Sequence, residues 1–356
     1  MHVQPDGSRT LQPEAYPLVL KFGHERRELI ERLTGEILHI KTRKCGLRPA
    51  DESNVSTSHA GACAHGDASC DRRTYYVHVH KAGGSLICQL AKQNNESLDG
   101  FALAHNCNCK RDGPNAEKHG WHPGYDRRCK AREQQLTSSF QMVERWMDSD
   151  TCGMRRAIMV RDPLDRIISN ALFEKKFISV SKIMEAIKPG AKLGLEEPLA
   201  LQEKAMVVWG TAAWDNFLVR TLGGPETFRT PARGLHREHL RRAKERLRDF
   251  EIVMTLDEFD TDSAQLAHVL GWTELVADAR EITACHGCGH PEMRNDGQSN
   301  PFTEEELQTL VKVNALDFEL VCYARKLARA RTARARDAGV LGAGHQLKEL
   351  RARQPS

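Results

Sequence analysis

The feature that most constrains the fold of this 356-residue chain is an apolar run that ends in a glycine-rich turn and restarts as a helix. The run Tyr75–Val79 is rich in aromatic and β-branched residues, as a short strand is. His80-Lys81-Ala82-Gly83-Gly84-Ser85 follows, and Leu86–Ala91 then has a helical pattern. A strand that turns directly into a helix is typical of an α/β sheet.

Two further apolar runs, Ala157–Val160 and Ile252–Thr255, are each followed by turn residues and helical periodicity, which predicts parallel strands beneath crossover helices. Phe101–His105 is a weaker fourth strand candidate. We therefore expect an α/β fold, a three-layer sandwich around a central parallel sheet. Long helices are predicted over Leu136–Met147, Leu199–Leu222, His236–Arg248 and Thr303–Ala330.

The chain divides into three predicted parts. Residues 1–70 combine an amphipathic helix, Glu25–Leu38, with a flexible linker, and residues 71–330 carry the strand and helix pattern. Residues 331–356 are expected to form a basic, disordered tail. Residues 324–336 hold six Lys or Arg and no acid, which favours a solvated helix end over the alternative, an arm for an anionic partner.

Charge and hydrophobicity exclude two classes of protein. Lys plus Arg number 52 and Asp plus Glu 48, a formal net charge of +4, so the surface as a whole is not built for nucleic acid. Hydrophobic residues make up 40%, and no stretch approaches the roughly 18 apolar residues of a membrane span. No signal peptide is readable at the N-terminus. We expect no nucleic-acid partner and no transmembrane segment in this chain.

The turn after the first strand has the parts of a phosphate-binding loop. Gly83 and Gly84 let the backbone approach a ligand closely, and the helix that follows points its first amides at that ligand. Ser85 adds a hydroxyl and Lys81 a positive charge. The loop is not a Walker A motif, because the chain contains no Gly-Lys pair, and this disfavours a nucleoside-phosphate kinase.

A second motif runs from Val160 to Ser169, with the sequence Val-Arg-Asp-Pro-Leu-Asp-Arg-Ile-Ile-Ser. Arg161 comes at the carboxyl end of a predicted strand, where ligands bind in open α/β sheets. Asp162 can cap the next helix and Pro163 suits its first position. An Arg fork and the Ser169 hydroxyl would hold a second phosphate. Each motif alone also fits an ordinary strand–helix turn, but the pair favours a ligand with two separated phosphates.

With these two motifs the chain resembles the Golgi-type carbohydrate sulfotransferase family, which includes heparan and chondroitin sulfate sulfotransferases. His78–Leu86 resembles that family's 5′-phosphosulfate loop and Val160–Ser169 its 3′-phosphate motif, with His80 and Ala82 in place of the usual Pro and Thr. The resemblance implies a P-loop-NTPase-like sulfotransferase fold. It also implies transfer of a sulfuryl group from 3′-phosphoadenosine 5′-phosphosulfate to a hydroxyl or amine of an acceptor, a glycan by analogy, with no metal required.

The resemblance also implies roles for particular residues. Lys81 would stabilise the charge on the leaving phosphate. A histidine would take the proton of the acceptor, with His122 ranked before His119 and His105, although an ordinary surface loop histidine is an equal alternative at each position. Glu174 is a further possibility. The residues expected to bind the donor are Lys81, Ala82, Gly83, Gly84, Ser85, Leu86, Arg161 and Ser169.

The 11 cysteines leave the compartment open between a lumen with disulfides and a reducing environment with free thiols. Cys285 and Cys288 could form a zinc half-site completed by Cys107 and Cys109, but we expect disulfides instead. The resemblance suggests the Golgi lumen or membrane, and the cytoplasm if the N-terminus is complete. The alternative function is a catalytically inactive nucleotide-binding or interaction protein that keeps the sulfotransferase fold.

Overall fold

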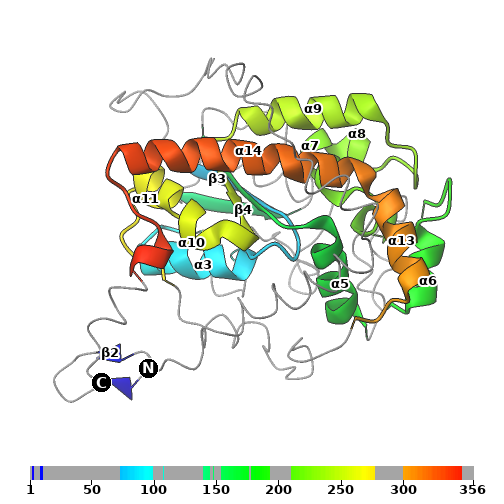
Figure 1. Cartoon of the computed structure of the whole chain (residues 1–356), viewed down its shortest axis with the longest axis horizontal. Helices are drawn as coiled ribbons and strands as arrows, with labels where there is room; N and C mark the ends of the chain where they lie inside the picture. Colours follow the sequence, from blue (N-terminus) through cyan, green and yellow to red (C-terminus); the bar gives the residue numbers. More distant parts are fainter. Residues whose placement is uncertain are drawn as a thin grey trace, which may run out of the picture.

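The computed structural model describes residues 2–3, 9–10, 73–98, 107, 139–144, 147, 154–175, 178–192, 210–276 and 300–346. Near the N-terminus, β1 (His2–Val3) pairs antiparallel with β2 (Arg9–Thr10). The other described residues form an α/β unit in which helices lie on both faces of a parallel sheet (Figure 1). This confirms the predicted three-layer sandwich.

The sheet has the order β4-β3-β5-β6 in the described ranges, and each neighbouring pair is parallel. His78, at the end of β3, pairs with Glu144 of β4, and Val160 of β5 pairs with Thr255 of β6. The carboxyl ends of the strands therefore meet at one edge, where an open α/β sheet binds ligands. The strands are β3 (Thr74–His78), β4 (Phe140–Glu144), β5 (Arg155–Val160) and β6 (Ile252–Thr255).

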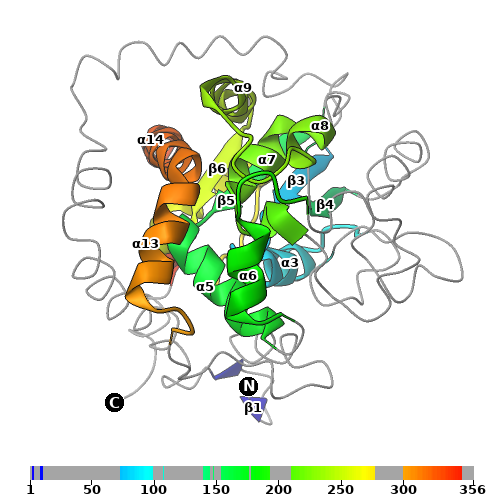
Figure 2. The ribbon, with the colours of Figure 1, turned by 90° about the vertical axis from the view of Figure 1, so that its right-hand side faces the viewer.

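Side chains alternate between the two faces of the sheet and build two cores. Tyr76 and Met159 pack with α3 (Gly84–Gln93) and α11 (Ala264–Leu270). Tyr75 and Ile158 face the opposite core, to which helices α5, α7, α9, α13 and α14 contribute (Figure 2). Those helices span Pro163–Glu174, Phe217–Gly223, Arg237–Arg248, Glu304–Val313 and Ala315–Asp337.

Shorter elements complete the described chain. After β6, the 3-10 turn η5 (Leu256–Glu258) leads into α10 (Phe259–Asp262), and α14 packs beside both β6 and α10. None of the helices in the described ranges is long and apolar enough to cross a bilayer. The remaining elements are α6 (Val180–Ala186), η4 (Gly210–Ala213) and α8 (Pro225–Phe228).

A fully buried ion pair fixes the chain around α7. Arg220 Nη2 lies 2.7 Å from Asp215 Oδ2, and both side chains are 0% exposed. Arg220 also donates to the carbonyl oxygens of Phe228 at 3.0 Å and Pro231 at 3.2 Å. Asp215 Oδ2 accepts a further hydrogen bond from the Arg233 backbone N–H at 2.7 Å. The pair thus ties α7 to the loop that follows α8.

Three predicted strands and the helix His236–Arg248 are confirmed, but the predicted helix Leu136–Met147 is wrong. Phe140–Glu144 is strand β4, and all five of its residues are buried. A strand buried on both faces has no alternating pattern, so sequence periodicity does not separate it from a buried helix. The other strand candidate, Phe101–His105, and the predicted helix Glu25–Leu38 lie outside the described residues.

Two long predicted helices are interrupted in the structure. Within Leu199–Leu222, η4 ends before Asn216, which has a φ of 50° and precedes α7. The helix predicted over Thr303–Ala330 is divided at Asn314, whose side chain bonds the carbonyls of Trp214 and Leu310. Asn favours such breaks because its amide competes with the helical backbone for hydrogen bonds.

The C-terminal helix extends further than the sequence indicates. α14 continues to Asp337, past residue 331, where the sequence predicted the start of a disordered tail. Arg331 and Thr332 are buried, and Arg331 Nη2 donates to the Arg248 carbonyl at 3.1 Å. These contacts hold the basic end of the helix against the domain.

Candidate functional site

The turn between β3 and α3 holds Lys81 in a left-handed backbone conformation, with φ of 65°. The Ala82 N–H donates to the Val79 carbonyl at 3.0 Å and closes the turn. Gly83 is also left-handed, with φ of 86°, and a Cβ on Gly84 would lie 1.8 Å from His78 Nε2. The turn therefore requires both glycines, because one supplies the backbone conformation and the other makes room for the histidine ring.

The N-terminus of α3 opens at this turn without a side-chain cap. Gly83 is the N-cap residue and has no side chain to accept from the first amides. Ser85 lies in the first turn of this 10-residue helix and is half-buried. Uncapped amides and the helix dipole together favour a bound anion.

Arg161 brings the second motif into contact with the first. It follows the last residue of β5, and its Nη1 donates to the Lys81 carbonyl at 3.1 Å. The next residue is Asp162, whose side chain accepts hydrogen bonds from the backbone amides of Leu164 at 2.9 Å and Asp165 at 3.2 Å. The predicted helix start is thus confirmed, with Asp162 as the cap and proline at the first position.

Lys81 sits in a partly desolvated environment. Its Nζ lies 3.9 Å from the centre of the Phe173 ring, a cation–π contact. Burial and the charge of Arg161 lower the pKa of Lys81 to about 8, although Glu174 opposes the shift. Burial also raises the pKa of Glu174 to about 8, against the charge of Lys81. At neutral pH, Lys81 is therefore mostly charged and Glu174 mostly protonated.

A buried pair of histidines and a carboxylate lies beside the turn, and sequence reasoning missed it. Glu144 Oε1 is 2.5 Å from His80 Nδ1, and its Oε2 is 3.3 Å from His78 Nδ1. Burial alone would raise the pKa of Glu144, but the two histidines lower it to about 2. Burial lowers the pKa of His80, and Glu144 opposes that shift. The signal available in the sequence was the spacing of His78 and His80, which are two residues apart and can share one partner. Glu144 was not considered as that partner, because it lies within the wrongly predicted helix Leu136–Met147.

Three further residues that are predicted to bind the sulfuryl donor, Ser169, Ala82 and Leu86, lie near this turn, each in a different environment. Ser169 is buried on α5, and no hydrogen bond within the described ranges joins it to Lys81 or Arg161. Ala82 is 1% exposed and its methyl group packs into the core beneath the turn. Leu86 packs against the core under α3. The structure therefore brings the Lys81 turn and Arg161 into direct contact, with Ser169 on the adjoining helix.

The predicted bases and most of the proposed metal half-site lie outside the described residues, namely His105, His119, His122, Cys109, Cys285 and Cys288. Cys107 is described, and it forms a disulfide with Cys88 of α3, with the Cα atoms 5.4 Å apart. It is therefore not the zinc ligand that the alternative required. Among the residues that the structure describes, no three His, Cys, Asp or Glu side chains are placed to hold a metal ion.

The model of the sulfotransferase family matches residues 69–324, a range that includes both motifs. The chain belongs to the sulfotransferase family. This membership confirms the family expected from the two motifs at the level of sulfotransferases in general. No curated protein matches this sulfotransferase.

Proposed function

We propose that this chain transfers a sulfuryl group from 3′-phosphoadenosine 5′-phosphosulfate to a hydroxyl or amine of a carbohydrate. Membership of the sulfotransferase family supports sulfuryl transfer in general. The hydrogen bond from Arg161 Nη1 to the Lys81 carbonyl carries the proposal, because it holds the cationic residues of the two motifs at one sheet edge. A donor with two separated phosphates needs two such cationic groups.

The residues around the turn divide naturally between the two ends of the donor. The glycines, the uncapped amides of α3 and Lys81 suit the 5′-phosphosulfate. Arg161 and Ser169, at the start of α5 and two turns into it, suit the 3′-phosphate. The donor supplies the activated sulfuryl group, and the protein supplies position and positive charge.

In the proposed reaction the acceptor oxygen or nitrogen forms a bond to sulfur while the bond from sulfur to the 5′-phosphate oxygen breaks. The products are adenosine 3′,5′-bisphosphate and a sulfate ester, or a sulfamate where the acceptor is an amine. Lys81 stabilises the negative charge that develops on the leaving phosphate. The acceptor proton passes to a base, for which His122, His119 and His105 stay the predicted candidates. Glu174 is less suited, because its raised pKa keeps it protonated at neutral pH.

The disulfide between Cys88 and Cys107 supports a Golgi-type location. Disulfides persist in oxidising compartments and are rare where thiols are kept reduced. This bond lies between α3, which begins at the proposed donor loop, and the chain that follows it. We therefore propose an oxidising lumen as the site of the reaction.

The proposed activity is tested by incubating the purified protein with 35S-labelled donor and a panel of glycans. We expect label in at least one glycan and release of an equal amount of adenosine 3′,5′-bisphosphate. Tight binding of the bisphosphate with no label in any acceptor would instead favour the alternative, an inactive nucleotide-binding protein.

Affinity for adenosine 3′,5′-bisphosphate is expected to fall as the pH rises above about 8. The pKa of Lys81 in the free protein is about 8, so its charge is lost above that pH. Bound phosphate favours the charged form of Lys81. Above the pKa of Lys81, binding is therefore coupled to the uptake of a proton, and the affinity falls by up to about tenfold per pH unit. Calorimetric titration from pH 7 to pH 9.5 measures this. The Lys81→Arg variant keeps its charge and should show only the smaller decline that ionisation of Glu174 above about pH 8 causes in both proteins; declines of equal slope in the two proteins would contradict the assignment.

A further inference from the structure

The side chain of Lys81 lies over an aromatic ring that α5 contributes. Its Nζ atom is 3.9 Å from the centre of the Phe173 ring. The ammonium group makes no ion pair or hydrogen bond with the residues that the structure describes. A cation over the face of an aromatic ring is attracted by the negative charge of that face. Within the described ranges, the Phe173 ring is therefore the group that fixes where the Lys81 ammonium lies.

The backbone of Lys81 is fixed independently of its side chain. Its φ of 65° is left-handed, a conformation that costs energy in a residue other than glycine. Arg161 Nη1 donates to its carbonyl at 3.1 Å, and the hydrogen bond from Ala82 to Val79 closes the turn. Strain of this kind is found at functional sites, where the surrounding structure enforces it. The freedom that is left to Lys81 is therefore in its side chain, which the ring restricts.

The Phe173 ring is held in turn from the sheet side. His80 lies edge-on to it, with the ring centres 6.0 Å apart and an angle of 70° between the planes. This is one of the arrangements that aromatic pairs prefer. Glu144 Oε1, at the end of β4, is 2.5 Å from His80 Nδ1 and fixes the imidazole. A line of contacts therefore runs from Glu144 through His80 and Phe173 to Lys81. Because His80 stands in place of the usual proline, this line is a feature of this chain.

Glu174 is the other group on α5 that could hold the Lys81 ammonium. It follows Phe173 directly and is buried. However, no ion pair joins it to Lys81, and burial raises its pKa to about 8. At neutral pH it is mostly a neutral acid, which attracts an ammonium group only weakly. The ring is therefore the better candidate for the task.

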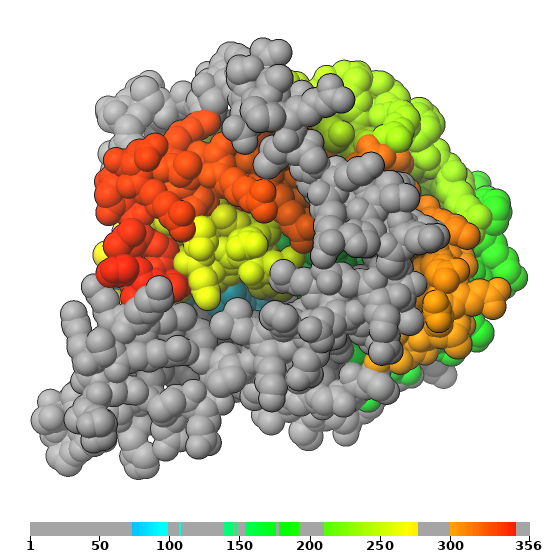
Figure 3. Space-filling model, in the orientation of Figure 1, coloured from blue at the N-terminus to red at the C-terminus, as the bar shows by residue number. Residues whose placement is uncertain are grey.

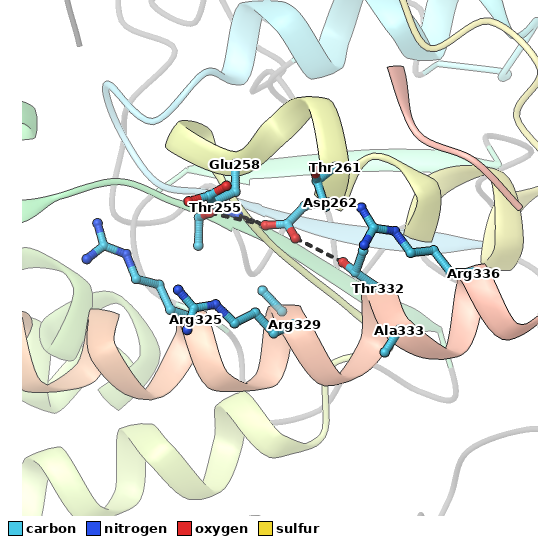
Figure 4. A pocket seen from close by; sticks show the side chains of 10 residues that line it. Thr255, Glu258, Thr261, Asp262, Arg325, Arg329, Thr332, Ala333 and Arg336 are labelled. Atoms are coloured by element: carbon cyan, nitrogen blue, oxygen red, sulfur yellow. Dashed lines mark hydrogen bonds between the residues drawn. The ribbon is translucent and has the colours of Figure 1, made fainter. Parts of the chain in front are cut away.

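The side of the turn away from α5 offers Lys81 no comparable contact among the described residues. Leu256 packs there, since a Cβ on Gly83 would lie 3.1 Å from its Cδ1. A pocket lies beyond it, where α10 and α14 are side by side at the surface (Figure 3). The buried carboxylate of that pocket, Asp262, already accepts from Thr332 Oγ1 at 2.9 Å (Figure 4). Neither the apolar contact nor this acid replaces the ring.

We propose that Phe173 is a positioning residue for sulfuryl transfer, which holds the Lys81 ammonium in the pose that meets the leaving phosphate. This rests on the proposed function, because that reaction gives Lys81 its role. Without the ring, a long flexible side chain must be ordered again in each reaction cycle. We therefore expect a slower reaction with little change in donor affinity, since Arg161 and the glycine turn remain in place.

The test compares Phe173→Leu, which keeps apolar bulk but removes the ring, with Phe173→Tyr, which keeps the ring. At saturating 35S-labelled donor, Phe173→Leu should transfer label about tenfold more slowly, and Phe173→Tyr within about twofold of the wild-type rate. The Kd for adenosine 3′,5′-bisphosphate should rise by no more than about threefold in either variant. The matched control is Tyr323→Leu, which removes a ring 5.8 Å from Lys244 Nζ and should leave the rate unchanged.

A second background shows whether the ring acts through Lys81. In the Lys81→Ala protein, the further change Phe173→Leu should not lower the rate again. Another tenfold loss there would overturn the proposal, because the ring would then act without Lys81. Equal losses in Phe173→Leu and Phe173→Tyr would also overturn it, as would a Phe173→Leu rate equal to or above that of the wild type. Equal losses accompanied by a lower Tm would mean that Phe173 serves only in packing.

A readout that needs no turnover separates this proposal from the proposed function. Methylene groups that lie over an aromatic ring give NMR signals shifted upfield. Protein with 13C-labelled lysine should show such a signal that disappears in Lys81→Ala and in Phe173→Leu and persists in Phe173→Tyr. If that pattern is found but no glycan is labelled, the proposed function fails while Phe173 is supported as the residue that positions Lys81. If glycans are labelled but the signal is absent, sulfuryl transfer stands and the positioning role is wrong.

Discussion

Lys81→Ala is expected to reduce sulfuryl transfer on the order of 10³-fold, because it removes the charge that faces the leaving phosphate in the proposed mechanism. The rate of label transfer from saturating 35S-labelled donor measures the loss. Thermal unfolding should show no loss of stability, since burial already disfavours the Lys81 charge and lowers its pKa. Because burial of the Lys81 ammonium group costs stability, its removal is expected to leave the fold intact.

The control for this variant is Lys182→Ala, which removes an exposed lysine on α6. It should transfer sulfuryl groups at the wild-type rate. A Lys81→Ala protein that is folded and keeps activity within about twofold of the wild type would remove Lys81 from the proposed mechanism, because a twofold change is only about 0.4 kcal/mol.

Arg220→Met is expected to lower the free energy of unfolding by about 3–5 kcal/mol, the range for breaking a buried ion pair. The change leaves the Asp215 carboxylate buried without its cation. It also removes the guanidinium group that donates hydrogen bonds to the carbonyls of Phe228 and Pro231. Denaturation in urea measures the effect. Asp215→Asn combined with Arg220→Met removes both charges and should recover part of the loss.

The matched control is Arg237→Met on α9. Arg237 pairs with Glu319, but its side chain is 75% exposed. An exposed pair of this kind contributes about 0–1 kcal/mol, so the variant should unfold nearly as the wild type does. Equal destabilisation by Arg220→Met and Arg237→Met would show that the buried pair has no special structural role.

Local rules were sufficient to predict the turn between β3 and α3 and the start of α5. A glycine pair, a capping Asp162 and a proline at the first position act within a few residues, so their pattern is visible in the sequence. The direct contact of Arg161 with the Lys81 carbonyl follows from the pairing of β3 with β5. Only the assumption that their ends meet at one edge was needed.

Features that depend on distant partners were not predictable in the same way. The bond between His80 and Glu144 joins residues 64 positions apart, and it needs β4 to be a strand. The sequence predicted a solvated basic end for α14. No pattern in the neighbouring residues indicates that Arg331 donates a hydrogen bond to the distant Arg248 carbonyl. The pocket between α10 and α14 likewise forms only once α14 has packed beside β6 and α10.

The most direct test of the donor site is the thermal shift produced by adenosine 3′,5′-bisphosphate on the wild type, Lys81→Ala and Arg161→Ala, with AMP as the ligand that lacks the second phosphate. A ligand that binds the native state raises its stability by mass action. We expect a clear rise in Tm with the bisphosphate, a much smaller one with AMP, and loss of the rise in both variants. Well-folded wild-type protein that shows no shift, or equal shifts with the two ligands, would contradict a donor site built from Lys81 and Arg161.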